Sequence, residues 1–453
     1  MPVAKFDLVL DTIKRFLRKG IINKISNMIN KMHPADIAKV IRHLSLPQER
    51  RTVFELIKDL PVKANVISEI DPSSIEDILN EMSSHEIVMI FKEIPSDDVA
   101  DILGYLPEDK STEILQLMKV EDSQDVEVLL KYHEETAGGI MTTEFFALHE
   151  ETTAGEATKR LQTDIDAEMV FYIYVTDNEG KLVGVVSLRQ LLLISPDTAL
   201  RKFMTTNVIS VVVDTDQEEV ARQVARYNIL AIPVVDKDNI LKGIITVDDV
   251  IDVIREEATE DMLKMAGTGE ETLMLEASTF IAARYRLPWL LTNLIGGIFT
   301  AGLLWLFRLT IREVIAIVSF IPVINSMAGN IGLQSSTIIV RGLATGGIES
   351  IDIYKVFLKE LKVGALMGMI CGTIVGIVAY IWHGNIMLGV VVGSSMFIAV
   401  GVAATMGTLV PLFFKRFDID PAISSGPFVT TVNDITGIIL YLSLATYLLN
   451  YLM

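Results

Sequence analysis

The sequence predicts a multidomain membrane protein with an all-α superhelical N-terminal domain, a tandem pair of α/β repeats and an α-helical transmembrane domain of five helices. Three observations predict this fold class. The first 272 residues hold 29 basic and 50 acidic side chains, whereas the last 181 hold only 10 and 8. A mean hydropathy of +0.43 places part of the chain in lipid. The charged part contains two different internal repeats, one helical and one α/β.

The composition narrows the classes of partner. The strong acidic excess of the charged part repels nucleic acid and anionic lipid headgroups, and it favours cations as partners. The single cysteine, Cys371, excludes an internal disulfide framework and a thiolate metal cluster. Charged residues between Lys5 and Lys14 interrupt any apolar N-terminal segment, so no signal peptide is predicted. We therefore expect the charged part to stay in the cytosol.

Stretches that are almost free of charge predict the membrane spans. About 20 apolar helical residues cross a bilayer core. The longest stretch exceeds one helix, and a turn-like His-Gly-Asn sequence at 383–385 divides it, so five transmembrane helices are predicted. The four stretches are Leu287–Phe307, Val314–Val340, Val363–Phe414 and Pro421–Met453.

Basic residues beside the spans predict the orientation. Arg308 and Arg312 fall on one side of the membrane, and eight basic residues fall on the other. The richer side is expected to be cytosolic, so the N-terminal domains lie inside and an odd number of spans places the C-terminus outside. The eight are Arg284, Arg286, Arg341, Lys355, Lys359, Lys362, Lys415 and Arg416.

Glycine spacing indicates how the third span packs. Gly364, Gly368, Gly372 and Gly376 recur at every fourth residue. Small residues at this spacing allow helix backbones to approach closely where lipid supplies no hydrophobic driving force. Glycine is also common in membrane helices generally, but four members in register favour a closely packed helix pair.

Two spans contain polar runs that do not suit a lipid environment. Residues 322–336 of the second span include Asn325, Asn330 and Gln334, and the fifth span contains Asp434. Polar groups at membrane depth are tolerated where they line water or pack against protein. Asp434 is the only acid deep inside a predicted span, and placing it there costs ~2.5–3.5 kcal/mol. A structural aspartate bonded to neighbouring threonines is one interpretation, and a cation site is the one we favour.

A proline-marked helical repeat is predicted within residues 1–130. Prolines at positions 34, 47, 61, 72, 95 and 107 are separated by 13, 14, 11, 23 and 12 residues, so one repeat lacks its proline. Proline in the first turn with an acid nearby marks a helix start. Short helices stacked in this way form a superhelical solenoid. Its histidines have no ligand spacing, so neither a metal site nor a catalytic centre is predicted there.

A tandem repeat covers residues 137–199 and 200–254. The Met-Thr-Thr sequence at 141–143 returns 63 residues later at 204–206. Each unit is predicted to contain a helix, two strands and a helix. The pattern resembles a pair of CBS domains, which are small βαββα modules that associate into a disc.

The nucleotide-binding form of CBS domains has a glycine, two apolar residues, a serine or threonine, two further residues and an aspartate. Residues 243–249 of the second copy match this motif. The resemblance therefore implies that ATP or another adenine nucleotide binds through Thr246 and Asp249. In the first copy Gln190 replaces the acid, which weakens a ribose contact there.

Residues 255–283 are predicted to form an acidic connecting helix. At 100° per residue, six acidic side chains between 249 and 261 share about half of the helix face. Like charges one turn apart destabilise a helix by ~0.2–0.5 kcal/mol per pair. We expect cations or a basic partner on this stripe, and a merely solvated acidic face is the alternative.

Taken together, these features resemble the MgtE family of magnesium channels over nearly the whole chain. The specific motifs are Gly-Asn-Ile-Gly-Leu-Gln at 329–334 and Asn-Asp-Ile-Thr-Gly at 433–437. The resemblance implies a homodimer in the lipid of the bacterial inner membrane that passes Mg²⁺ inward through a pore domain at 284–453. The implied pore residues are Asp434, Asn330, Thr430, Gly329 and Gln334.

The resemblance also implies a cytosolic Mg²⁺ sensor. Scarce Mg²⁺ would leave the carboxylates repelling one another and the pore open, and plentiful Mg²⁺ would bridge them and close it. Asn228 departs from the family, because some members have an acid at that position. The implied sensor residues are Asp97, Asp101, Asp216, Glu218, Asp249, Asp252, Glu257, Glu260, Asp261 and Asp420.

Two other functions fit parts of the sequence. A secondary transporter that couples a divalent cation to H⁺ or Na⁺ would suit the interrupted second span. Against it, the spans show no inverted repeat and only one buried ionisable residue for a proton relay. A membrane-tethered regulator that reads nucleotide would leave Asp434 dispensable. No enzyme is predicted, because neither a nucleophile–base pair nor a phosphate-cradling loop occurs.

Overall fold

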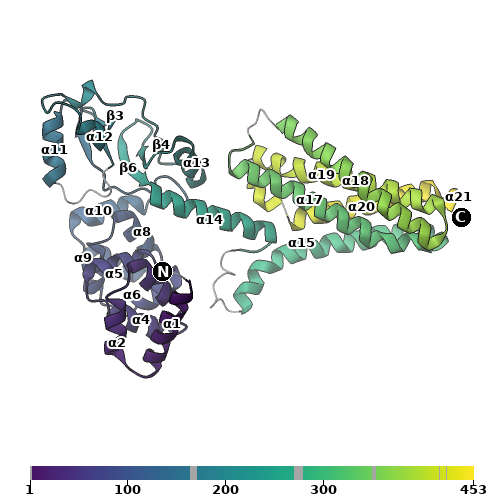
Figure 1. The fold of residues 1–453 in the computed structure, drawn as a ribbon, viewed down its shortest axis with the longest axis horizontal. Coiled ribbons are helices and arrows are strands. Elements are labelled where there is room, and N and C mark those ends of the chain that lie inside the picture. The colour runs from purple at the N-terminus through teal and green to yellow at the C-terminus, as the bar shows by residue number, and fades with distance from the viewer. Residues whose placement is uncertain are drawn as a thin grey trace. The chain divides into compact units, whose positions relative to one another are not determined.

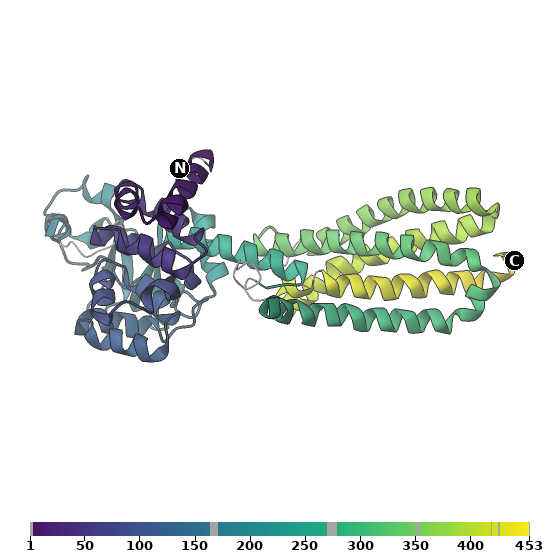
Figure 2. The same ribbon diagram turned by 90° about the horizontal axis from the view of Figure 1, so that it is seen from below.

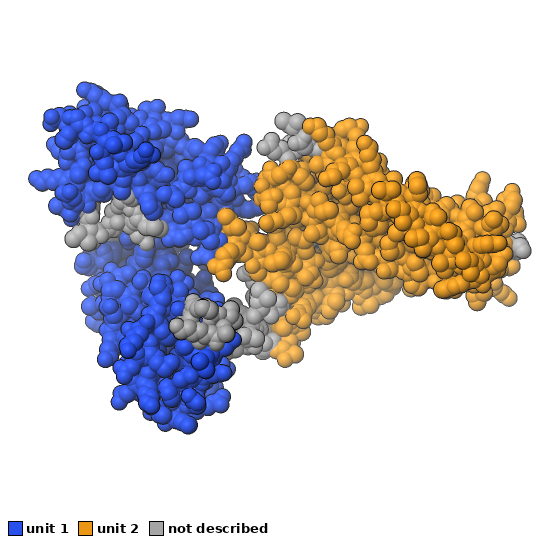
Figure 3. Space-filling view, in the orientation of Figure 1, with its two compact units in different colours: residues 1–253 blue, residues 254–453 orange. Residues whose placement is uncertain are grey.

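The computed structural model describes residues 3–163, 171–269, 279–348, 353–417, 419–424 and 426–452. The chain divides into two compact units, Met1–Val253 and Ile254–Met453 (Figure 3). Each unit has a hydrophobic core of its own.

The N-terminal part of the first unit is a stack of short helices (Figure 1). The six prolines occupy the first turn or the N-cap of a helix, as predicted. The repeat without a proline starts instead with a capping box, in which Ser83 and Glu86 bond each other's backbone N–H groups. The helices are α1 (Val3–Arg18), α2 (Ile22–Ile29), α3 (Pro34–Arg42), α4 (Pro47–Glu55), α5 (Leu60–Ser68), α6 (Pro72–Leu79), α7 (Ser84–Phe91), α8 (Ser96–Gly104), α9 (Glu108–Leu117) and α10 (Val120–Leu129).

Each α/β repeat has the predicted βαββα order. In both, the first strand pairs parallel with the second, and the second pairs antiparallel with the third. The first repeat contains β1 (Ala147–His149), α11 (Ala154–Thr163), β2 (Tyr172–Thr176), β3 (Leu182–Ser187) and α12 (Leu188–Leu191). A 3₁₀ turn, η1 (Leu200–Lys202), leads to the second repeat. That repeat contains β4 (Val211–Val212), α13 (Gln217–Tyr227), β5 (Ala231–Val235), β6 (Leu241–Thr246) and α14 (Val247–Ala266).

The two repeats exchange their leading segments. Thr142, at the start of the first repeat, pairs with Ile244 of β6, and Thr205, at the start of the second, pairs with Val185 of β3. The repeated Met-Thr-Thr sequence therefore extends the sheet of the other copy. The pair forms one structural body rather than two independent modules.

The connecting helix starts earlier than predicted. The prediction placed it at 255–283, whereas α14 begins at Val247, immediately after β6, and its helical part ends at Ala266. Residues 270–278 of the predicted range lie outside the described residues, and 279–283 belong to the next helix. The last helix of the second repeat thus continues into the second unit without a break.

Among its described residues, the second unit has five helices long and apolar enough to span a membrane, as predicted (Figure 2). The turn expected at 383–385 is present, and Gly384 there has a φ of +67°. The long helices are α15 (Thr279–Leu306), α17 (Ile321–Ala344), α18 (Ile353–His383), α19 (Ile386–Arg416) and α20 (Pro427–Tyr447). Shorter segments are α16 (Arg308–Glu313), η3 (Ile315–Phe320), η4 (Pro421–Ser424) and α21 (Leu449–Leu452).

The glycine ladder of α18 packs closely on α19, which confirms that prediction. A Cβ atom on Gly372 would lie 2.5 Å from the carbonyl oxygen of Gly393, and one on Gly376 would lie 2.7 Å from that of Gly389. The two backbones approach too closely for any larger residue at these positions.

Candidate functional site

One face of α17 is polar, and no other part of the described chain covers it. Ser326, Asn330, Gln334 and Thr337 are all exposed, at intervals of four, four and three residues. This spacing follows one side of a helix. We call these four residues the α17 polar stripe.

The exposed faces of other spanning helices are apolar instead. Leu290, Leu294 and Ile298 of α15 are more than half exposed, and so are Leu366 and Ile370 of α18. Such faces suit contact with lipid tails, but a row of amides and hydroxyls does not. The α17 polar stripe therefore requires water or another protein surface at membrane depth.

Helix α20 places Asp434 beside a buried amide. Asp434 is half-buried, and its neighbour Asn433 is 1% exposed. The side chain of Asn433 lies directly against Gly332 of α17. Among the described residues, neither side-chain polar atom of Asn433 has a hydrogen-bond partner, and the same holds for Oδ1 of Asn325. Orphaned amides of this kind indicate a polar seam between the two helices.

The structure brings some predicted pore residues together. Thr430 of α20 lies against Gly329 of α17, where a Cβ would be 3.5 Å from the threonine methyl. Asn330 and Gln334 belong to the α17 polar stripe, and Asp434 follows the amide that contacts the same helix. Asn433 was part of the predicted motif, but its burial depends on helix packing that the sequence does not reveal.

The threonines near Asp434 donate their hydroxyl hydrogens elsewhere. Thr430 donates to the carbonyl oxygen of Gly426 at 2.9 Å, and Thr436 donates to that of Val432 at 2.9 Å. Thr431 donates to the Asn293 side chain at 3.0 Å. These bonds favour the cation-site interpretation of Asp434 over a structural aspartate held by its threonine neighbours.

The spanning helices hold a further buried acid that was not predicted. Glu360 of α18 is 6% exposed and accepts a hydrogen bond from Ser335 of α17 at 2.9 Å. Lysines at 355, 359 and 362 made this segment resemble a cytosolic flank. Because α18 begins at Ile353, Glu360 instead turns onto a packed face of the helix.

Two acidic side chains of the first unit lie close enough to repel each other. Burial raises the pKa of Asp249 to about 6, helped by the charges of Asp248 and Asp98 and opposed by a hydrogen bond from Thr246. Burial also raises the pKa of Asp98, and the charges of Asp248 and Asp252 add to this effect. Acidic side chains of α8 and α14 therefore lie within electrostatic reach of one another.

The neighbouring solenoid acids have different surroundings. The hypothesis named Asp97 and Asp101, of which Asp97 is 8% exposed and Asp101 is exposed. Asp98 was not among the predicted sensor residues. Adjacent acids on a helix point in directions about 100° apart, and only the packing shows which one faces the α/β repeats.

Two predicted sensor residues have local structural roles. Asp216 caps α13 by accepting from the backbone N–H of Glu218 at 2.9 Å, and Glu218 forms an ion pair with Arg222 at 3.1 Å. Asn228 ends the same helix in the left-handed conformation, with a φ of 51°. Asparagine tolerates that conformation better than most residues, which accounts for its presence there.

The remaining predicted sensor acids gather at the start of the second unit. Burial raises the pKa of Asp261 to about 6; Asp420, Glu257 and Glu260 contribute, and the charge of Lys264 opposes the shift. The ammonium group of Lys264 contacts Asp420 at 2.7 Å and Glu260 at 2.5 Å. Asp420 was predicted at the start of the fifth span, and it does lie just before η4 and α20.

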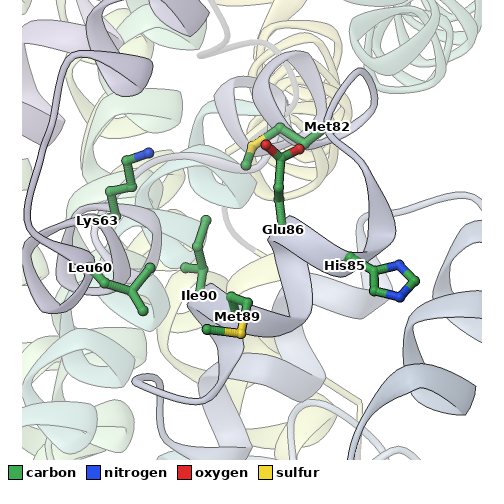
Figure 4. Close-up of a pocket in the computed structure, with 7 residues that line it drawn as sticks. All are labelled: Leu60, Lys63, Met82, His85, Glu86, Met89 and Ile90. Carbon is green, nitrogen blue, oxygen red and sulfur yellow. The ribbon is translucent and has the colours of Figure 1, made fainter.

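Across the described ranges, no three His, Cys, Asp or Glu side chains are close enough together to hold a metal ion. The helical stack has a pocket of about 290 Å³ between α5 and α7 (Figure 4). Its Glu86 carboxylate is already engaged with Ser83, at 2.7 Å from the hydroxyl. The pocket was not predicted, and it is lined by Leu60, Lys63, Met82, His85, Glu86, Met89 and Ile90.

The glycines of the CBS motif have a packing role. A Cβ on Gly243 would lie 2.8 Å from the sulfur of Met141. A Cβ on Gly184 would likewise collide with the side chain of Met204. Thr246 is 3% exposed, and its hydroxyl donates to the Asp249 carboxylate at 2.5 Å. The motif glycines therefore allow the exchanged segments to pack closely, in addition to any role in ligand binding.

Comparison with known proteins identifies the parts of the chain. The model of the MgtE family, described as a divalent cation transporter, matches residues 321–444. The MgtE intracellular N domain matches 32–135, and the CBS domain matches 137–197 and 200–256. The cytosolic domain of the Mg²⁺ channel MgtE, solved in complex with ATP, is 35% identical with a TM-score of 0.50, and the match covers 54% of this chain and 99% of that one.

Full-length relatives give the same result. The chain is 37% identical over 318 residues to the magnesium transporter MgtE of Bacillus subtilis, covering 70% of each chain. It is 40% identical over 321 residues to the magnesium transporter MgtE of Thermus thermophilus, covering 70% of this chain and 71% of that one. The chain therefore belongs to the MgtE family.

Proposed function

We propose that the protein is a Mg²⁺-selective channel for magnesium uptake that closes when cytosolic Mg²⁺ is high. It acts as a homodimer in the bacterial inner membrane, with the N-terminal domains in the cytosol and the C-terminus outside. Transport is its activity, and it catalyses no chemical reaction. Membership of a family of divalent cation transporters supports the substrate class.

The single observation that carries this proposal is the α17 polar stripe, which lies on the helix that packs against Asn433 of α20. A row of exposed polar side chains on a spanning helix is stable only against water or protein. A second copy of the chain facing this stripe encloses a polar path, and it brings two Asp434 carboxylates to one axis. Asn330, Gln334, Gly329 and Thr430 then line the path near the carboxylates.

The chemistry of this path suits Mg²⁺. The ion holds its water shell tightly and usually binds through one or two carboxylates with several waters retained. Paired aspartates, amides and carbonyls can accept hydrogen bonds from a hydrated octahedral ion. Weak outer-sphere binding of this kind also allows the ion to leave, which conduction requires.

The acidic groups supply the gate. Burial raises the pKa values of Asp98, Asp249 and Asp261, and repulsion from nearby acids adds to the shift. Mg²⁺ that bridges such carboxylates, with Asp97, Asp101, Asp216, Glu218, Asp252, Glu257, Glu260 and Asp420 contributing, removes the repulsion and holds the pore closed. An adenine nucleotide such as ATP binds the second repeat through Thr246 and Asp249. The Asp249 carboxylate therefore belongs to both the nucleotide site and the Mg²⁺ sensor.

The test is a recording from inside-out membrane patches while bath Mg²⁺, on the cytosolic side, is varied. Wild-type current should fall as Mg²⁺ rises. Asp434→Ala should lose conductance or Mg²⁺ selectivity while still assembling, and Asp434→Asn should retain part of both because an amide oxygen accepts from hydrated Mg²⁺. A fully assembled Asp434→Ala protein that passes Mg²⁺ like the wild type would remove the pore site from this position.

A proton-coupled divalent-cation transporter is the second candidate, and Glu360 favours it. A buried carboxylate that accepts a hydrogen bond from a serine hydroxyl is a typical member of a proton relay. In proteoliposomes, coupled transport would collapse an imposed pH gradient during Mg²⁺ flux, and Glu360→Gln would abolish that collapse. A channel would carry Mg²⁺ with the pH gradient unchanged.

A further inference from the structure

A lysine within the acidic connecting helix already occupies two of the proposed sensor carboxylates. The Nζ atom of Lys264 is 2.5 Å from a carboxylate oxygen of Glu260 and 2.7 Å from Oδ2 of Asp420. Its side chain is 27% exposed, and that of Asp420 is 32% exposed. The three groups form a partly desolvated ion cluster, in which charged hydrogen bonds are stronger than at an open surface.

This cluster joins the end of α14 to the start of the fifth span. The second oxygen of Asp420, Oδ1, accepts from the backbone N–H of Ala422 at 2.8 Å, in the turn that leads to α20. The backbone of Met265 lies directly against Gly426, which has a φ of +56°. A Cβ on Gly267 would lie 3.0 Å from the ring of Pro427, the first residue of α20.

The local charges show what Lys264 opposes. Asp261 is repelled by Asp420, Glu257 and Glu260, and Lys264 acts in the opposite direction. The Lys264 ammonium donates to the carboxylates of Asp420 and Glu260, and a lysine side chain is charged at physiological pH. The lysine therefore supplies a fixed positive charge where the proposed function requires a divalent cation.

We propose that Lys264 is a tethered cation that competes with Mg²⁺ for Glu260 and Asp420, and thereby sets the Mg²⁺ concentration at which the pore closes. This inference rests on the proposed Mg²⁺ gating. The ammonium holds the connecting helix to the fifth span with a single charge. Mg²⁺ must displace it before both carboxylates can serve the ion.

The competition predicts the direction of a substitution. Replacing Lys264 by methionine keeps the length and apolar stem of the side chain but removes its charge. Both carboxylates become free, and the negative potential around Asp261 increases. Mg²⁺ should then bind more tightly, although the helix loses its ion-independent attachment.

The experiment uses the full-length protein in detergent and in membrane patches. Two quantities are measured over a series of Mg²⁺ concentrations. The thermal unfolding temperature reports binding, and the patch current reports channel closure. We expect Lys264→Met to lower the half-effective Mg²⁺ concentration by about threefold or more in both assays. Lys264→Arg, which keeps the charge, should stay near the wild type. Lys237→Met is the charge-matched control, because Lys237 is 84% exposed and distant in sequence.

Each outcome decides the proposal. An unchanged or higher half-effective concentration for Lys264→Met overturns the competition while the proposed gating stands. If Lys264→Met fails to assemble, Lys264→Gln is measured instead, and its half-effective Mg²⁺ concentration decides the proposal in the same way. A wild-type channel that Mg²⁺ does not close refutes the proposed function, and the role of Lys264 falls with it. A shift in the Lys237→Met control as large as that of Lys264→Met would assign the effect to net charge and overturn the specific role.

Discussion

A single buried amide determines how closely the two polar spanning helices approach. Asn433 is 1% exposed and packs on Gly332, so the neighbouring Asp434 is placed by contact rather than by hydrogen bonds. Buried polar groups without partners are costly, and proteins retain them mainly at functional positions. The position of the candidate pore carboxylate therefore depends on the size of residue 332.

Gly332→Ala should disturb the pore without preventing insertion. The added methyl would overlap the Asn433 amide, and overpacking of this kind costs about 1–3 kcal/mol. We expect Mg²⁺ conductance to fall several-fold in patch recordings. Gly297→Ala is the control, because a Cβ there meets nothing within 4 Å. Normal conductance in the single variant would disprove the placement argument.

The raised pKa of Asp249 makes the stability of fragment 1–269 depend on pH. The folded state binds the proton more tightly than the unfolded state, because the folded pKa is about 6 against an ordinary value of 3.8. Stability should therefore rise as pH falls from 7.5 to 5, by about 1 kcal/mol from this group. Urea unfolding at several pH values should show that Asp249→Asn loses this part of the dependence. A variant with the full wild-type dependence would contradict the assignment.

At the scale of elements, the close pair of α18 and α19 depends on glycine backbones in contact. Gly372→Ala would place a methyl 2.5 Å from the carbonyl oxygen of Gly393. The helices must separate, which removes packing along the whole ladder. We expect a thermal unfolding temperature in detergent that is several degrees lower. Gly401→Ala, also on a spanning helix but with open space around it, should change it little. Equal effects of the two substitutions would exclude close packing as the cause.

Helix α14 has a different role from the packed spans. It starts as the last element of the second α/β repeat and continues into the second unit. Its acidic side chains are destabilising as a set, and Lys264 offsets part of that repulsion. A helix with this charge pattern is well suited to respond to cations.

At the scale of the whole molecule, bridging and simple repulsion make opposite predictions for the sensor. Asp252→Asn, Glu257→Gln and Glu260→Gln together remove ligands but also relieve repulsion. We expect bridging to dominate, because the remaining acids still repel one another. The triple variant should then conduct at Mg²⁺ concentrations that close the wild type.

The same variant should lose protection by Mg²⁺ against proteolysis. Millimolar Mg²⁺ should protect the wild-type protein, whereas 150 mM NaCl should not, because a monovalent ion screens carboxylates without bridging them. The lysine substitutions provide an internal comparison, since they alter cation competition while leaving the acids in place. A triple variant closed even at low Mg²⁺ would favour repulsion as the controlling force.

The sequence by itself determined the architecture of this protein. Proline intervals located the short helices, the repeated Met-Thr-Thr sequence located the α/β repeats, and charge-free stretches located five spans. These signals are local, because a helix start, a strand turn and a membrane span each depend on residues close together in the chain. The family motifs added the candidate pore and sensor residues.

Only the tertiary structure decided which of these residues meet. It placed Asp98 of the solenoid within electrostatic reach of carboxylates at the start of α14, and it buried Glu360 against Ser335. It also joined Lys264 to Asp420, which are 156 residues apart in the chain. The physical reason is that burial and pairing are set by contacts between distant segments. Composition and periodicity report only which face of an element is apolar, and not which side chain of another element lies opposite.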